Sequence, residues 1–116
     1  MFHPVLKLKI YNQDLVFGPG LITLLRYIEQ SGSMKEACAE MGMSYSKGWK
    51  IVNRAEKELG YELLSRRHGG NMGGQCEMTA QGRSLAERYE EMENEISKIT
   101  IEKFVKYFPE YNLISK

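Results

Sequence analysis

Side chains suited to binding a nucleic acid recur on one side of the segment 44–59. In a helix with about 100° per residue, Ser46, Lys50 and Asn53 share a face that has no carboxylate at its centre. Lys donates to guanine, Asn pairs bidentately with adenine, and Ser bonds to either base. The candidate DNA-binding residues here are Ser44, Tyr45, Ser46, Lys47, Trp49, Lys50, Asn53, Arg54 and Lys57. A helix face that carries lysines only because it is solvated would look similar.

A second candidate site is the loop that follows this segment. Arg66, Arg67 and His68 precede the run Gly-Gly-Asn-Met-Gly-Gly, which ends at residue 74. Glycines allow a hairpin tip to approach a phosphate backbone closely, and arginines reach phosphates or a narrow minor groove. We therefore expect a basic, glycine-rich wing over residues 66–75, with a merely flexible hairpin as the alternative. The pattern of a nucleotide-binding loop, GxxxxGK[ST], does not occur.

The charge distribution agrees with these two candidate sites. Residues 44–75 carry six basic and three acidic side chains, whereas the rest of the chain carries ten basic and twelve acidic ones. A net charge of +1 therefore hides one basic segment in a mildly acidic chain. Such segregation is expected where a single face meets a polyanion.

The elements that would position these residues follow from periodicity and capping signals. Alternation over 5–11 and a short apolar run at 15–17 predict an N-terminal β-hairpin. Apolar residues at helical spacing predict a helix over 21–28. Ser33 and Glu36 form a capping box for a short helix that ends at Gly42. Ser44 caps the next helix, and Gly60 ends it. Two helices joined by a short glycine-containing turn indicate a helix-turn-helix.

The C-terminal part is expected to be one long helix. Thr79 or a neighbour caps it, and it continues with a break to about residue 107. Its apolar residues recur at spacings of 4, 3, 4 and 3, which is a heptad stripe over two repeats. The candidate dimerisation residues are Leu85, Tyr89, Met92, Ile96 and Ile99. A helix lying on its own domain would show a similar pattern. A homodimer would place two recognition helices about one DNA turn apart, suited to a two-fold symmetric site.

Together these elements predict a mainly α fold with a small β component. It is a winged helix-turn-helix with an N-terminal β-hairpin, a glycine-rich wing and a long C-terminal dimerisation helix. Residues 1–82 are expected to form the DNA-binding domain, and residues 83–116 a helical dimerisation segment.

Other classes of protein fit the sequence poorly. Cys38 and Cys76 lack the spacing of a metal site, so we expect free thiols, no metal and no cofactor. The only histidines, His3 and His68, have no suitably spaced acid or nucleophile, so no enzyme is expected. The N-terminus lacks the pattern of a secretion signal, and the longest apolar stretch nearby, 21–25, is far below the ~18 residues of a membrane span. We therefore expect a cytoplasmic protein without a membrane partner.

Residues 18–85 resemble the N-terminal winged-helix domain of the ModE molybdate-responsive regulators and, more distantly, the LysR-type regulators. The matching motifs are SYSKGWKIVNRAEKELG, the double-glycine wing, and MTAQG before a long helix. The resemblance implies a transcription factor whose helix from Ser44 enters the major groove and whose long helix dimerises. Full ModE regulators carry further C-terminal domains that bind molybdate. This chain ends at Lys116, so molybdate binding is not expected.

Three residues depart from the pattern of the family. Gly48 stands where a small or aliphatic core residue is usual, and it is expected to weaken packing slightly. Gln75 and Met78 replace a glycine and a leucine of the wing. The function expected is a sequence-specific DNA-binding transcriptional regulator, with double-stranded DNA as partner. The alternative is a winged-helix adaptor for protein interaction or dimerisation that does not bind DNA.

Overall fold

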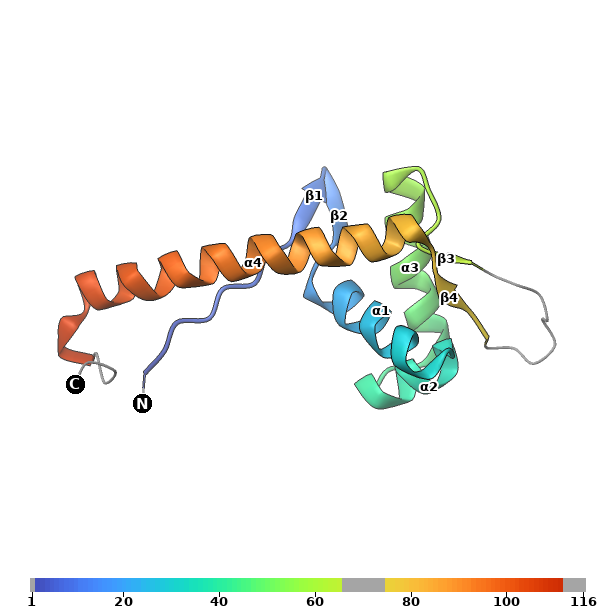
Figure 1. The fold of residues 1–116 in the computed structure, drawn as a ribbon, viewed down its shortest axis with the longest axis horizontal. Coiled ribbons are helices and arrows are strands. Elements are labelled where there is room, and N and C mark those ends of the chain that lie inside the picture. Colours follow the sequence, from blue (N-terminus) through green and yellow to red (C-terminus); the bar gives the residue numbers. More distant parts are fainter. Residues whose placement is uncertain (1, 66–74, 112–116) are drawn as a thin grey trace.

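The computed structural model describes residues 2–65 and 75–111 and is mainly helical (Figure 1). Its elements in chain order are β1 (Ile10–Asn12), β2 (Asp14–Phe17), α1 (Pro19–Ser31), α2 (Met34–Met41), α3 (Tyr45–Leu59), β3 (Leu64–Ser65), β4 (Glu77–Met78), α4 (Ala80–Tyr107) and a 3-10 turn, η2 (Pro109–Tyr111). Strands β1 and β2 form one antiparallel pair, and β3 and β4 form another. This is the predicted winged helix-turn-helix.

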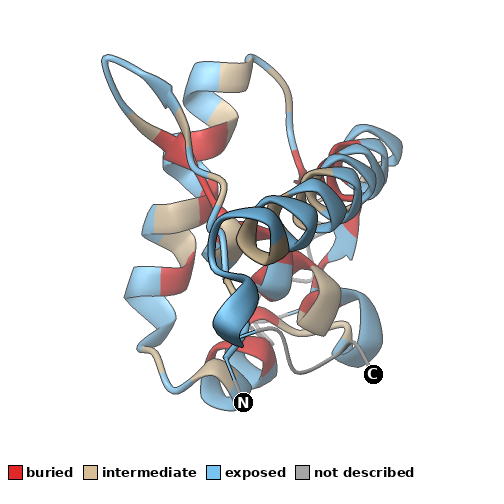
Figure 2. Cartoon of the chain, turned by 90° about the vertical axis from the view of Figure 1, so that its left-hand side faces the viewer, coloured by how far each residue is buried: buried red, intermediate tan, exposed pale blue. Residues whose placement is uncertain are grey.

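One apolar core joins α1, α2, α3, both strand pairs and the first turns of α4. Helix α1 is its centre, because the apolar residues of its predicted stripe are all buried. The core residues with no exposed surface include Leu24, Leu25, Ile28, Met34, Val52, Leu63 and Leu64. Figure 2 shows buried segments where these elements meet, and an exposed distal α4. Burial of this apolar surface is the main stabilising contribution to the fold.

The predicted turn between α2 and α3 is present, with one change in its capping. The Ser33 Oγ accepts a hydrogen bond from the backbone N–H of Glu36 at 3.1 Å, as expected. The backbone N–H of Ser33 instead donates to the Ser31 Oγ at 3.2 Å. In a full capping box the Glu36 side chain would accept from this N–H. Here the hydroxyl of Ser31, which is nearer along the chain, accepts instead. Gly42 ends α2 with φ of 70°.

Gly48 sets the distance between α2 and α3. A Cβ atom at this position would overlap the Sγ of Cys38 and lie 3.1 Å from the Sδ of Met34. Both of those side chains are buried. The expectation that Gly48 weakens packing is therefore wrong: the missing side chain lets α3 approach α2 closely.

The N-terminal strand is shorter than the alternating sequence suggests. Only Ile10–Asn12 pairs with β2, so residues 5–9 of the predicted strand are outside the sheet. The reason is that β2 has four residues before α1 begins, and a longer β1 would have no partner. The preceding residues run beside α4 (Figure 1), where the Tyr89 Oη donates to the Leu8 carbonyl at 2.8 Å.

Helix α4 is continuous over 28 residues, so the predicted break is absent. Between Gly82 and Pro109 the sequence has no glycine or proline to interrupt it. Within the helix, the Thr100 hydroxyl donates back to the Ile96 carbonyl at 2.8 Å. Leu85, Ala86 and Tyr89 belong to the core. The expected domain boundary at residue 82 thus falls inside a helix, and the division stays a prediction.

An ion-pair network joins α1 to α4. Arg26 donates to both carboxylate oxygens of Glu90, at 3.0 Å and 2.7 Å, and to Glu29 at 2.8 Å. Arg83 lies 3.5 Å from the second oxygen of Glu29. The hydrogen bonds that Arg26 donates lower the pKa of Glu90, and the same bonds raise the pKa of Arg26. The network supports the packing of α4 on the domain.

Substituting Gly48 with Ala should destabilise the protein. Forcing a methyl group into a packed core typically costs about 1–3 kcal/mol, and the better helix propensity of Ala returns at most about 1 kcal/mol. We expect a net loss of about 1–2 kcal/mol in the free energy of unfolding, measured in urea. Gly20→Ala is the control, because a Cβ there meets no atom within 4 Å. Equal stability of the Gly48→Ala variant and the wild type would contradict the close approach.

Acid should destabilise the wild type more than a Glu90→Gln variant. A carboxylate with a lowered pKa contributes stability above its unfolded pKa, and this contribution is lost as pH falls through the folded value. Urea titrations between about pH 5 and pH 3 should show a shallower loss for Glu90→Gln. Glu87→Gln, on an exposed part of the same helix, should follow the wild type. Identical slopes for all three proteins would exclude a role for the Arg26–Glu90 pair.

Candidate nucleic-acid interface

Helix α3 is held at both ends by the residues that the sequence indicated. The Ser44 Oγ accepts a hydrogen bond from the Lys47 backbone N–H at 3.1 Å. Gly60 adopts φ of 86°, and its N–H donates to the Glu56 carbonyl at 2.8 Å. Gly48, Val52 and Ala55 are buried. The orientation of α3 is thus fixed by its caps and by one apolar side.

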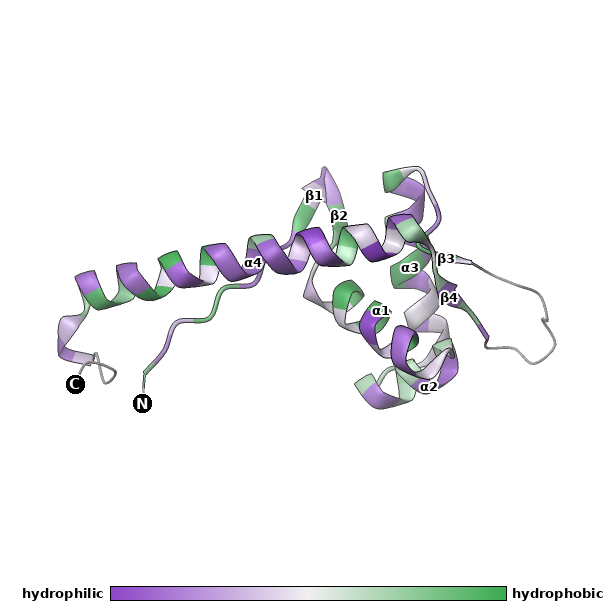
Figure 3. Ribbon diagram, viewed as in Figure 1, coloured by the Kyte–Doolittle hydropathy of each residue, from purple (hydrophilic) through white to green (hydrophobic). Residues whose placement is uncertain are grey.

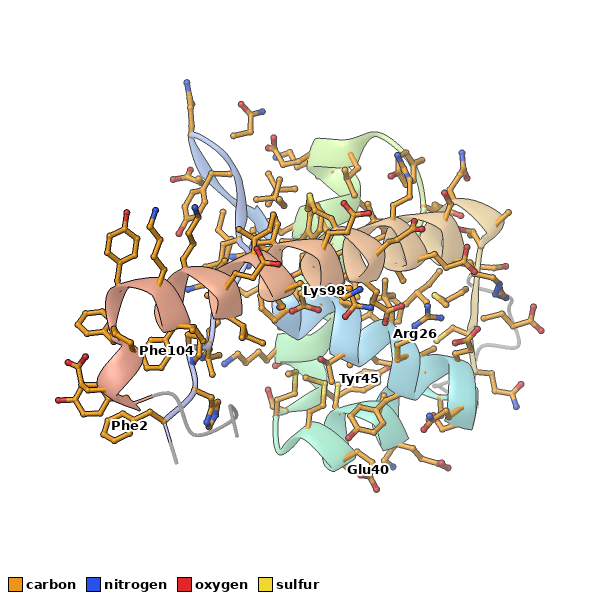
Figure 4. All side chains as sticks on the ribbon, turned by 60° about the vertical axis from the view of Figure 1, so that its left-hand side comes forward. Phe2, Arg26, Glu40, Tyr45, Lys98 and Phe104 are labelled. Carbon is orange, nitrogen blue, oxygen red and sulfur yellow. The ribbon has the colours of Figure 1, made fainter. Side chains whose placement is uncertain are left out.

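The predicted polar face of α3 is on the surface. The exposed candidate residues are Ser44, Tyr45, Ser46, Lys47, Lys50, Asn53, Arg54 and Lys57. Trp49 is half-buried, and its ring packs edge-on against Tyr45 with centroids 6.5 Å apart. Figure 4 shows the Tyr45 side chain, near the start of α3, at the α2–α3 end of the domain. The structure therefore presents hydroxyl, amide and cationic groups together along one helix.

Two carboxylates of α3 have partners beside that face. Glu56 accepts hydrogen bonds from the backbone N–H groups of Leu63 at 2.7 Å and Leu64 at 3.3 Å. Glu58 accepts one from the side-chain amide of Asn12 at 3.1 Å. On a helical wheel both glutamates lie off the centre of the face, but their partners were not predicted. The Asn12 contact spans 46 residues, so no local signal could have revealed it.

The base of the wing is part of the described structure. Leu64 pairs with Met78 and Ser65 with Glu77. An isolated bridge joins Ser33 to Gln75, next to the turn between α1 and α2. The Thr79 hydroxyl donates to the Glu62 carbonyl at 2.7 Å. Of the wing candidates, Arg66, Arg67 and His68 lie outside the described residues, together with the glycine-rich tip.

The five candidate dimerisation residues fall into two groups. Leu85 and Tyr89 are buried in the core of their own chain, and the Tyr89 ring packs on Phe17 with centroids 5.9 Å apart. Met92 and Ile99 are 40% and 51% exposed, and Ile96 is half-buried. Figure 3 shows hydrophobic and hydrophilic segments alternating along this distal α4. The first part of the stripe thus stabilises the monomer, and only the second part is accessible.

The two ends of the described chain meet beyond this exposed stretch. Figure 4 shows Phe2 and Phe104 at the end of α4 that is distant from Arg26. The ring centroids of Phe2 and Tyr111 are 4.6 Å apart, and those of Phe104 and Phe108 are 5.7 Å apart. Phe2 and Phe108 remain 60% and 49% exposed. The aromatic cluster at this end is therefore only partly covered by its own chain.

Other chemical features are few in the described part of the chain. Cys38 and Cys76 are both buried, and burial raises the pKa of the Cys38 thiol. Among residues 2–65 and 75–111, no three His, Cys, Asp or Glu side chains gather as metal ligands would. None of the helices described there has the length and apolar character needed to cross a bilayer.

Comparison with known proteins gives a family match over the same region. The model of the family described as bacterial regulatory helix-turn-helix protein, lysR family, matches residues 20–83. This range starts in the first turn of α1 and ends in the first turn of α4. It therefore includes the whole helix-turn-helix and both strands of the wing.

Curated relatives and a solved structure agree with this match. The chain is 33% identical over 86 residues to the DNA-binding transcriptional dual regulator ModE of Escherichia coli K12, covering 74% of this chain and 32% of that protein. It is 29% identical over 82 residues to the molybdenum-pterin-binding protein MopB of Rhodobacter capsulatus, covering 71% and 30%. This chain thus spans about a third of these relatives. ArgP from Mycobacterium tuberculosis shares the fold, with 23% identity and a TM-score of 0.50 over 70% of this chain and 29% of that one.

Proposed function

Because the chain belongs to the lysR family of bacterial regulatory helix-turn-helix proteins, we propose that it binds duplex DNA through α3 and regulates transcription. The observation that carries the proposal is the outward face of α3. It exposes lysine, asparagine and serine side chains, while both glutamates of its C-terminal half accept hydrogen bonds beside it. A helix that enters the major groove must offer donors to the bases and must not repel the phosphates.

Each part of α3 has its own task in this proposal. Ser46 and Lys50, near the N-terminal end, contact base edges, as the start of a recognition helix does. Arg54 and Lys57, farther along the helix, contact backbone phosphates and position the protein without reading sequence. Asn53 lies between the two groups.

The wing extends the contact beyond the major groove. We propose that Arg66 and Arg67 reach the neighbouring phosphates or minor groove, because β3 and β4 bring the chain out beside α3. His68 would lie against the same backbone. The region shared with the curated relatives covers about a third of their length, so molybdate binding is not transferred to this chain.

We propose that the protein acts as a homodimer in the cytoplasm and has no enzymatic activity. The exposed apolar side chains of Met92 and Ile99, seven residues apart on one face of α4, lie on a part of the helix that extends past its own domain (Figure 1). A second copy packed along this stretch would bury them and would pair two recognition helices.

The direct test starts from genomic fragments selected by the protein and sequenced. Binding to the selected duplex should weaken steeply with salt, because phosphate contacts release counterions. Lys50→Ala should cost about 1–3 kcal/mol and relax specificity at one base position, whereas Lys57→Ala should weaken all sequences alike and reduce the salt slope by about one. Arg88→Ala, on the exposed side of α4, is the control and should bind like the wild type.

Two results would overturn this function. One is no binding to any fragment at roughly 50 mM salt, where phosphate contacts are strong. The other is a protein partner cross-linked through Tyr45 or Trp49 in place of DNA, which would favour the adaptor function.

The dimer makes a separate prediction. Met92→Glu combined with Ile99→Glu should shift the protein towards monomers in sedimentation equilibrium, because a charge opposite an apolar seam is costly to bury. Asn94→Glu, at an exposed polar position of the same helix, should leave the mass unchanged. A wild-type protein that stays monomeric at micromolar concentration would contradict the proposed seam.

A further inference from the structure

The tip of the N-terminal hairpin lies beside the C-terminal half of α3. An open groove of about 390 Å³ separates the two elements. Its lining residues are Asn12, Gln13, Asp14, Leu15, Arg54, Lys57 and Glu58. Figure 1 shows β1 and β2 projecting near the end of α3 that is farther from α2. The groove therefore adjoins the exposed face of the proposed recognition helix.

The hairpin and the wing lie on opposite flanks of that face. At about 100° per residue, Glu56 and Glu58 point in directions about 200° apart around α3. Glu56 bonds to the backbone of Leu63 and Leu64, where the chain enters the wing. Glu58 bonds to Asn12 of the hairpin. The exposed polar face thus lies between two β-hairpins.

The groove carries two cationic side chains that suit an anion. Arg54 and Lys57 are exposed, and within the described part of the chain neither forms an ion pair. The Glu58 carboxylate, which could have paired with them, is held by the Asn12 amide. Gln13 adds a second exposed amide at the turn, where its backbone takes φ of 72°. Two carboxylates of the groove oppose an anion: Asp14, and Glu58, which keeps its charge while it accepts from Asn12.

We propose that this hairpin is a second wing that contacts the DNA backbone. Arg54 and Lys57 bind one backbone phosphate, and Asn12 and Gln13 border this phosphate-binding site. The inference rests on the proposed binding of α3 to DNA and adds a backbone contact on the flank opposite β3 and β4. Two backbones border a major groove, so a helix lying in it has phosphates on both sides.

Charge changes at the hairpin tip test this assignment in the full-length protein. Gln13→Lys should bind the duplex selected from genomic fragments more tightly, roughly three- to tenfold at low salt, and should steepen the salt slope by about one. Gln13→Glu should weaken binding by a similar factor. Asp14→Asn should also tighten binding, because it removes the opposing charge. Arg88→Gln is the control for a charge change elsewhere.

Further measurements distinguish the loss of a DNA contact from a change in the folding of the hairpin. Gln13→Gly should keep the turn, since glycine readily adopts positive φ, and should lose only the amide. Thermal unfolding of all variants reports their folding. In a phosphate-ethylation interference experiment, ethylation of one backbone phosphate should block binding of the wild type. Ethylation of the same phosphate should have no effect on binding of the Arg54→Gln, Lys57→Gln double variant.

The outcomes distinguish this inference from the function on which it depends. If the wild type binds no DNA, both fail. If Lys50→Ala weakens binding while Gln13→Lys and Gln13→Glu bind like the wild type at every salt concentration, only the second wing is overturned. Opposite shifts for Lys and Glu at this one position support the contact.

Discussion

The closeness of α2 and α3 at Gly48 is the constraint on which the rest of the structure depends. Gly48 has no side chain, so the sulfur atoms of Cys38 and Met34 pack directly against the backbone of α3. This contact sets the distance between the two helices. That contact fixes the rotation of α3 about its axis. The rotation in turn determines which residues are exposed, and it brings Lys50 and Asn53 to the surface. The candidate DNA-binding face thus depends on the absence of a side chain at Gly48, together with the buried Val52 and Ala55 on the same side of the helix.

Hydrogen bonds hold the two glutamates in the C-terminal half of α3. Glu56 and Glu58 are the carboxylates closest to its polar face, and each accepts from an uncharged N–H donor. Within residues 2–65 and 75–111, ion pairs join α1 to α4, where Arg26 meets Glu29 and Glu90. This separation of roles leaves cationic groups accessible where a polyanion would lie.

The helix-turn-helix could be predicted from the sequence because its signals are local. Ser33, Ser44 and Gly60 lie within a few residues of the groups they cap. Features that depend on distant partners could not be predicted. Tyr89 belongs to the heptad stripe by its spacing, yet it bonds to Leu8, 81 residues away, and packs in its own core. Likewise, alternation over 5–11 does not reveal that β2 is too short to pair with it. The wing tip, with Arg66, Arg67 and His68, stays a prediction from composition.

The unbroken length of α4 has a geometric consequence for any two-fold assembly. At 1.5 Å per residue, 28 residues form a rod of about 42 Å. Its first ten residues are anchored in the core, so the rod transmits its direction rigidly to the exposed turns. A single inserted residue after Tyr89 would rotate everything beyond it by about 100° relative to the domain. In the proposed homodimer, the number of residues in this helix would therefore set the rotational phase between the two recognition helices.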